Sequence, residues 1–82
     1  MQINMKIGVT HDQLESLIVN DVRRRAHCDG FKAISFYRTA EIPGTNWVPA
    51  SVNYGKAGSV VCDAALREII PRMQREYDLI GG

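Results

Sequence analysis

The chain has 82 residues, of which 45% are hydrophobic and 23% charged, and its formal net charge is +1. A chain this short builds one domain, residues 1–82, and its composition excludes a disordered polypeptide. A net charge so close to zero excludes an overall field that attracts nucleic acid or an anionic membrane, although charges can still cluster locally.

Targeting signals and cysteine usage narrow the class of protein further. No apolar run approaches the ~20 residues that a membrane span requires, and the N-terminus lacks the pattern of a secretion signal. Cys28 and Cys62 are too few for a disulfide framework, so we expect both to be reduced and packed in the interior. These features predict a cytoplasmic protein without a membrane segment, and its small core favours a homodimer.

The first predicted element is a short strand at Gln2–Val9. Its apolar residues Ile3, Met5, Ile7 and Val9 alternate with polar residues and glycine. This is the period of a strand with one buried face.

A helix is predicted to begin after Thr10 and to stop at Gly30. Thr10 and Gln13 have the spacing of a capping box, and a glycine is a common residue just past a helix end. The buried stripe of this helix comprises Leu14, Leu17, Ile18, Val22 and Ala26.

Asp21 and Arg25 stand four residues apart in the apolar arc of this helix. As a pair within the helix they contribute a few tenths of a kcal/mol. The alternative is a polar contact that fixes register at a helix–helix or subunit interface. The first interpretation is favoured, because long side chains at a rim turn easily to solvent.

A β-hairpin is predicted to follow. Residues 31–42 are rich in strand formers, Pro43 and Gly44 form a turn, and a second strand runs over Trp47–Tyr54. Pro49 has no N–H to donate, so the second strand is expected to lie at an edge of the sheet or to be irregular near its start.

The last predicted element is a long amphipathic helix at Ser59–Ile80. Pro71 normally breaks a helix, but the apolar arc stays in phase across it and Pro71 falls on the polar side. We therefore predict one continuous, bent helix. Its apolar arc comprises Cys62, Ala65, Leu66, Ile69, Ile70, Met73, Tyr77 and Ile80.

These elements predict a small α+β domain of order β-α-β-β-α. An antiparallel hairpin, alone or extended by the strand at Gln2–Val9, carries both helices on one face.

The loop before the last helix is a candidate anion-binding site, formed by Gly55, Lys56, Gly58 and Ser59. A G-x-x-G between a strand and a helix can expose backbone N–H groups beside the positive end of the helix dipole, and Lys56 adds charge. A simpler interpretation is favoured, in which the glycines shape the connection and Ser59 caps the helix.

A candidate interaction surface combines basic and aromatic residues. Arginines near the end of a helix offset its dipole, and together with exposed aromatic rings they can bind nucleic acid. We expect Trp47 and Tyr37 on a free hairpin face, where a lone tryptophan is more typical of packing or a dimer contact. The candidate residues are Arg23, Arg24, Tyr37, Arg38 and Trp47.

No motif indicates catalysis, a metal or a cofactor. His11, His27, Cys28 and Cys62 lack the short spacings of zinc ligands. Cys62 lies in the first turn of its helix, where the dipole favours a thiolate, yet it belongs to the apolar arc. We therefore expect no enzyme, no metal and no cofactor.

The terminal Gly81-Gly82 is similar to the tail of ubiquitin-like proteins and small sulfur carriers. Those two residues alone carry the likeness. A helix that continues to Ile80 also leaves no place for the strands that follow the helix in that fold.

The predicted function is a small non-catalytic protein–protein interaction module, which forms a homodimer or binds another protein. The alternative is a nucleic-acid or phosphate-ligand binding module that uses the loop at Gly55–Ser59 and the cluster Arg23–Arg25.

Overall fold

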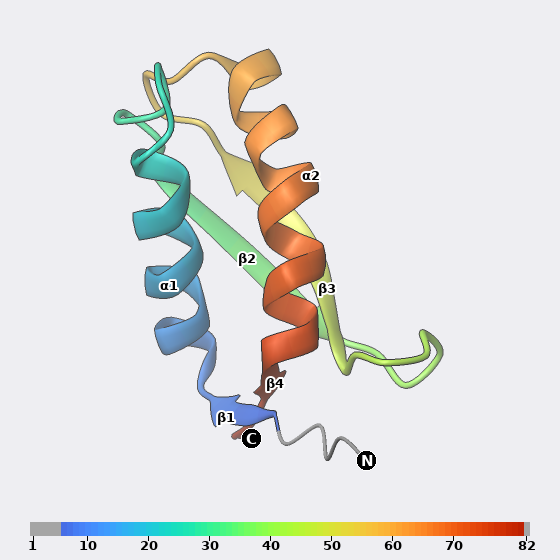
Figure 1. Cartoon of the computed structure of the whole chain (residues 1–82). Helices are drawn as coiled ribbons and strands as arrows, with labels where there is room; N and C mark the ends of the chain where they lie inside the picture. The colour runs from blue at the N-terminus through green and yellow to red at the C-terminus, as the bar shows by residue number, and fades with distance from the viewer. Residues whose placement is uncertain (1–5, 82) are drawn as a thin grey trace.

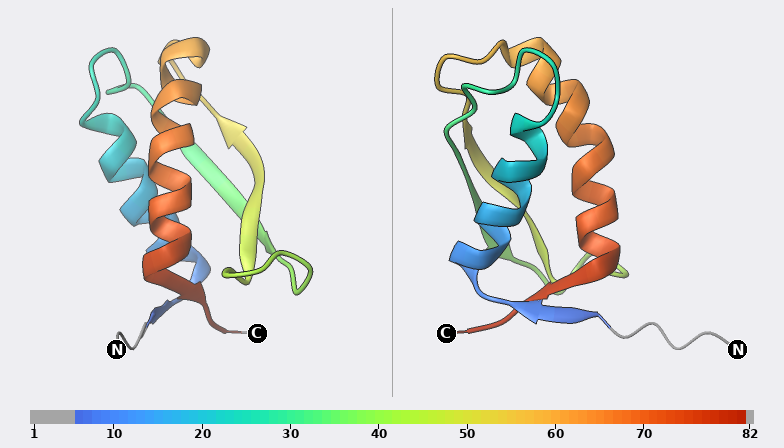
Figure 2. Two further views of the ribbon diagram at one scale, coloured as in Figure 1. Left: turned by 45° about the vertical axis from the view of Figure 1, so that its right-hand side comes forward. Right: turned by 60° about the vertical axis from the view of Figure 1, so that its left-hand side comes forward.

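The computed structural model describes residues 6–81, which form two helices, a hairpin and a second pair of short strands. Both helices lie on one face of the hairpin, and the second strand pair closes one end of the molecule (Figures 1 and 2). The predicted α+β class is confirmed. The elements are β1 (Ile7–Val9), α1 (His11–Arg23), β2 (Ala33–Arg38), β3 (Trp47–Asn53), α2 (Ser59–Glu76) and β4 (Tyr77–Leu79).

The hairpin pairs β2 with β3 in antiparallel register, with an irregularity between Ser35 and Phe36. Phe36 lies opposite Pro49, and its N–H points away from β3, to the side chain of His11. Pro49 therefore occupies a position that faces the outer edge of β3. That edge pairs with no other strand among residues 6–81, so the predicted edge strand is confirmed.

The other edge of the hairpin is covered by side chains of α1. Nε2 of His11 accepts a hydrogen bond from the N–H of Phe36 at 3.3 Å. The carboxylate of Glu15 accepts one from the N–H of Ile34 at 3.2 Å. A strand edge with unpaired N–H groups can pair with another chain. These two hydrogen bonds occupy the N–H groups of Ile34 and Phe36 at this edge.

The two ends of the chain meet in a parallel pair, with Ile7 opposite Tyr77 and Val9 opposite Leu79. Of the two predicted alternatives for the hairpin, the structure shows it alone, because β1 pairs with β4; the predicted end of the last helix at Ile80 is wrong, since the helix ends at Glu76. The predicted strand residues before position 6 lie outside the described part of the chain. The last helix is shorter than predicted because residues 77–79 pair with β1. This tertiary contact overrides the local helix propensity of those residues.

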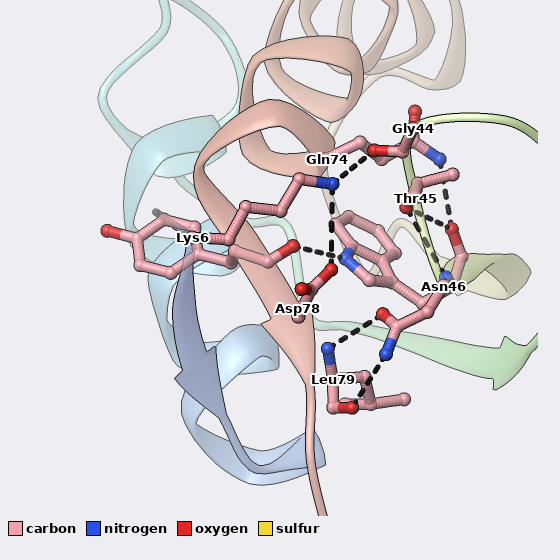
Figure 3. A network of polar contacts seen from close by, with 9 residues as sticks. Lys6, Gly44, Thr45, Asn46, Gln74, Asp78 and Leu79 are labelled. Atoms are coloured by element: carbon pink, nitrogen blue, oxygen red, sulfur yellow. Dashed lines mark hydrogen bonds and ion pairs between the residues drawn. The ribbon is translucent and has the colours of Figure 1, made fainter. Parts of the chain in front are cut away.

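The side chain of Asn46 holds β4 in place through two hydrogen bonds with Leu79. Its amide donates to the carbonyl of Leu79 and accepts from the N–H of Leu79, both at 2.9 Å. Lys6 adds an ion pair with Asp78 at 3.5 Å and donates to the carbonyl of Gly44 (Figure 3). The turn of the hairpin thereby holds the end of the chain extended.

Helix α1 begins as predicted and ends early. The capping box is present: the Thr10 hydroxyl accepts from the N–H of Gln13, whose side chain accepts from the N–H of Thr10. The helix stops at Arg23, so Ala26 is exposed instead of buried. His27 adopts a left-handed conformation with φ of 67°, which reverses the chain three residues before Gly30.

Asp21 and Arg25 bridge the two helices. Arg72 of α2 donates to the carboxylate of Asp21, and Arg25 donates to Glu68 at 2.8 Å. The favoured pair within α1 is therefore wrong, because α2 brings opposite charges closer. Each pair is partly exposed and contributes at most about 1 kcal/mol, so its role is mainly in setting the register of the helices.

Helix α2 is continuous through Pro71, as predicted. Pro71 is exposed, so water can satisfy the carbonyl that its missing N–H leaves free. The inner side of α2 is fully apolar, and only Ile80, which lies beyond the helix, leaves the expected arc at 50% exposed. Its buried residues are Cys62, Ala65, Leu66, Ile69 and Met73.

Gly55, in the loop before α2, packs closely against Gly30, in the turn after α1. Its φ is +59°, and a Cβ there would lie 2.4 Å from the carbonyl oxygen of Gly30. We expect Gly55→Ala to lower the free energy of unfolding by about 2 kcal/mol or more, because strain and overlap add. Urea denaturation measures the change.

Gly44→Ala is the matched control. Gly44 also has a positive φ, of +84°, but nothing lies within 4 Å of its added Cβ. Its cost is then only the left-handed backbone, about 1 kcal/mol. Equal losses in the two variants would contradict the close approach of Gly55 to Gly30.

Candidate functional site

Three backbone N–H groups of the Gly55–Ser59 loop donate hydrogen bonds within the protein. The N–H of Gly55 donates to the side chain of Asn53 at 2.9 Å. The next two donate to the carbonyls of Gly30 and Tyr54, at 3.3 and 3.0 Å. These three groups are therefore not directed at an anion, and Lys56 stands exposed beside them.

The expected cap of α2 is also wrong in detail. Gly58 occupies the N-cap position and Ser59 is the first helical residue, so no side chain caps the helix. The loop is shaped instead by its contact with the turn after α1, where a Cβ on Gly30 would approach Lys56 and Ala57 to 3.2 Å.

The three arginines at the end of α1 diverge. Nε of Arg23 donates to the carbonyl of Phe31 at 2.8 Å, and Arg25 pairs with Glu68. Arg24 lines a hollow of about 310 Å³ together with Asp21. Two of the three arginine side chains are thus engaged by groups of the protein itself, Arg23 by a carbonyl and Arg25 by a carboxylate, whereas Arg24 is exposed.

Trp47 is buried, so the prediction that it lies on a free hairpin face is wrong. It is 0% exposed, and its ring packs edge-on against Phe36 with centroids 5.1 Å apart. Its indole N–H donates to the carbonyl of Tyr77 at 3.0 Å, and its own carbonyl accepts from Gln74 at 3.0 Å. The end of α2 and β4 cover it, and β4 is the strand that the sequence did not reveal.

Tyr37 and Arg38 are exposed, as expected, and Arg38 lies opposite the buried Trp47 in the hairpin, but neither residue joins the arginines of α1. Tyr37 is 57% exposed, and Arg38 donates to the carbonyl of Gly81. Both lie at the end of β2 nearest the chain termini, whereas α1 ends with Arg23 at the opposite end of the molecule (Figure 1). The structure therefore does not bring the five candidate residues together.

One cluster that the sequence reasoning missed is formed by His11, Asp12 and Glu15. Each offers one potential metal-ligand atom, and these atoms lie within 4.8 Å of one another. His11 and Glu15, however, already accept the backbone N–H groups of β2. The hydrogen bonds to the edge of β2 account for the positions of His11 and Glu15. The side chain of Asp12 is fully exposed.

An apolar groove of about 410 Å³ runs between α2 and the hairpin. The backbone of α2 lies close to α1 and farther from β3, which leaves the groove open beside the unpaired edge. Two charged residues, Asp63 and Arg67, stand along it. Its apolar lining includes Pro49, Val52, Leu66, Ile70 and Pro71.

The N-terminal turn of α2, the helix that forms one wall of this groove, exposes apolar side chains. Val60 is 81% exposed and Val61 is 41% exposed. At 100° per residue, Val60, Asp63, Arg67 and Ile70 fall within an arc of about 80° on one side of the helix. This side of α2, which borders the buried arc at Ile70, therefore carries both an exposed apolar residue and part of the wall of the apolar groove.

The two cysteines are buried and adjacent. Both are free and 0% exposed, and their Sγ atoms lie 3.1 Å apart. Burial, followed by the hydrogen bond to Cys28, raises the pKa of the Cys62 thiol to about 11. The predicted packing is confirmed, and the raised pKa removes the thiolate character that a helix N-terminus can provide.

Comparison of the chain with protein-family models, with curated proteins and with solved structures finds no match. Within residues 6–81 no helix has the length and apolar content needed to cross a membrane.

The raised pKa of Cys62 predicts how stability depends on pH. The thiol titrates near 9.0 in the unfolded chain and near 11 in the folded one, so its contribution is complete below the lower value. As pH rises between the two values, the unfolded state loses its proton first and stability falls. The Tyr54 hydroxyl, whose pKa is raised by its hydrogen bond to Asp63, adds a loss in the same direction.

Urea denaturation at neutral and alkaline pH measures this fall. Cys62→Ala should be less stable at neutral pH and should lose less on going to alkaline pH, because its thiol no longer titrates. The same alkaline loss in the parent and the variant would contradict the role of Cys62.

Proposed function

We propose that this domain is a non-catalytic protein–protein interaction module that pairs with a second copy of itself along α2. The proposal rests on one observation: the apolar groove beside α2 lies on the same helix as Val60, the most exposed large hydrophobic side chain in the described residues. A non-catalytic role is supported by the raised pKa of Cys62 and by the use of His11 and Glu15 as acceptors for β2.

The spacing of residues along α2 supports a two-fold pairing. Val60 and Ile70 are each five positions from Ala65, and Asp63 and Arg67 are each two positions from it. A two-fold axis across the helix at this level sets two copies of α2 antiparallel. Val60 of one copy then faces Ile70 of the other, and Asp63 faces Arg67.

The same arrangement is self-complementary in shape and charge. Val60 has no large apolar neighbour to cover it in the monomer, and the groove wall at Ile70 supplies one in the pair. Burial of both copies of Val60 contributes a few kcal/mol, and each rim-exposed ion pair contributes about 0.2–1 kcal/mol. The apolar contact therefore supplies the affinity, while the charges select the antiparallel orientation.

Charge exchange between two variants tests the pairing. Asp63→Arg alone places two arginines opposite each other, and Arg67→Glu alone places two acids opposite each other. Each variant should be monomeric in analytical ultracentrifugation at concentrations where the parent protein is dimeric. A mixture of the two variants should dimerise, because both contacts become attractive.

Two controls accompany this experiment. Asp63 also accepts a hydrogen bond from Tyr54, so thermal unfolding of each variant must confirm that it is folded. Val60→Asp should weaken the dimer, whereas Ile42→Asp, at a residue 45% exposed in the turn between β2 and β3, should not. A parent protein that stays monomeric at high micromolar concentration would contradict self-pairing.

The alternative function, binding of nucleic acid or a phosphate ligand, would use Lys56 with Arg23–Arg25. Phosphate contacts make affinity fall steeply as salt rises. Because Arg23 and Arg25 are engaged by the Phe31 carbonyl and by Glu68, we expect no oligonucleotide binding even at low salt, measured by fluorescence anisotropy. Salt-sensitive binding that Lys56→Ala abolishes would favour the alternative.

A further inference from the structure

The two buried thiols come from segments that are distant in the sequence. Cys28 lies in the turn between α1 and β2, and Cys62 lies in the first turn of α2, 34 positions later. Their Sγ atoms are 3.1 Å apart, about 1 Å more than the length of an S–S bond. A small movement of either segment therefore brings the two sulfur atoms to bonding distance.

We propose that Cys28 and Cys62 are a site of oxidative modification, at which a disulfide ties the turn after α1 to the first turn of α2. The oxidant is a low-molecular-weight disulfide such as oxidised glutathione. The site is distinct from the proposed dimer surface, because both thiols are 0% exposed and lie on the inner side of α2.

The chemistry proceeds in two exchange steps. The thiolate of one cysteine attacks the small disulfide, whose S–S bond breaks, and a mixed disulfide and one small thiolate result. The second cysteine, as its thiolate, then attacks the protein sulfur of the mixed disulfide and releases the second small thiolate. The protein loses two electrons and two protons, and the small disulfide gains them as two thiols.

Burial controls when this reaction takes place. A small disulfide cannot reach a sulfur that is 0% exposed, so the turn carrying Cys28 must first open. Thiolate is also scarce at rest, because the pKa of Cys62 is raised to about 11. The folded protein therefore keeps the thiols reduced for long periods, and the cross-link forms during local opening or refolding.

Once formed, the disulfide restricts the unfolded chain. It closes a loop across 34 positions, which lowers the conformational entropy of the unfolded state. For a domain of this size, the expected rise in Tm is about 10 °C or more. A packing contact between two small buried side chains predicts neither a cross-link nor this rise.

The experiment refolds the full chain from urea in buffers of oxidised and reduced glutathione at several ratios. We expect a species that has lost two hydrogen atoms and carries no glutathione, and a peptide map that joins Cys28 to Cys62. Its Tm should exceed that of the reduced protein in the same buffer, and dithiothreitol should abolish the difference.

Single-cysteine variants are the controls. Cys28→Ala and Cys62→Ala should show no change of Tm between oxidised and reduced buffers. Cys28→Ser and Cys62→Ser replace any alanine variant that fails to fold. The proposal is overturned by glutathione attached to the cysteines without a cross-link, by thiols that stay reduced after oxidative refolding, or by a cross-linked protein with a lower Tm.

Discussion

The burial of Trp47 is the contact on which most of this fold depends. Trp47 opens β3, its indole N–H donates to the carbonyl of Tyr77 at 3.0 Å, and its ring packs against Phe36. One side chain thus joins the hairpin to the end of α2 and to β4. Loss of a fully buried tryptophan costs about 3–5 kcal/mol. Small domains have about 5–15 kcal/mol in total, so this contact is a large share of the stability.

The contacts of Trp47 also determine which surfaces of the hairpin and of α2 remain exposed. Hydrogen bonds from Trp47 to Tyr77 and from Gln74 to the Trp47 carbonyl hold β4 and the end of α2 against the start of β3. Farther along, a groove lined by Pro49, Val52 and Ile70 stays open beside the unpaired edge of β3. Pro49 removes a donor from that edge, which disfavours the addition of another strand there.

Features governed by local rules were predictable from the sequence. The capping box of Thr10 and Gln13, the edge position of β3 and the tolerance of Pro71 each depend on a few neighbouring residues. The burial of Trp47, the helix-bridging pairs of Asp21 and Arg25, and the adjacency of Cys28 and Cys62 depend on which distant segments meet. No sequence pattern that we recognised predicts these contacts between distant segments. Strand β4 was missed because residues 77–80 continue the apolar phase of a helix, and only contacts with distant residues, namely β1, Asn46 and Trp47, favour the extended form.

Hydrogen exchange of the Trp47 indole N–H, followed by NMR on ¹⁵N-labelled protein, tests whether the buried Trp47 ties the hairpin to β4. If this N–H is held by the Tyr77 carbonyl in the core, it should exchange only through global unfolding, with the same protection as the most protected backbone amides of α2. Exchange near the rate of a free indole, in a protein whose α2 amides remain protected, would contradict the account.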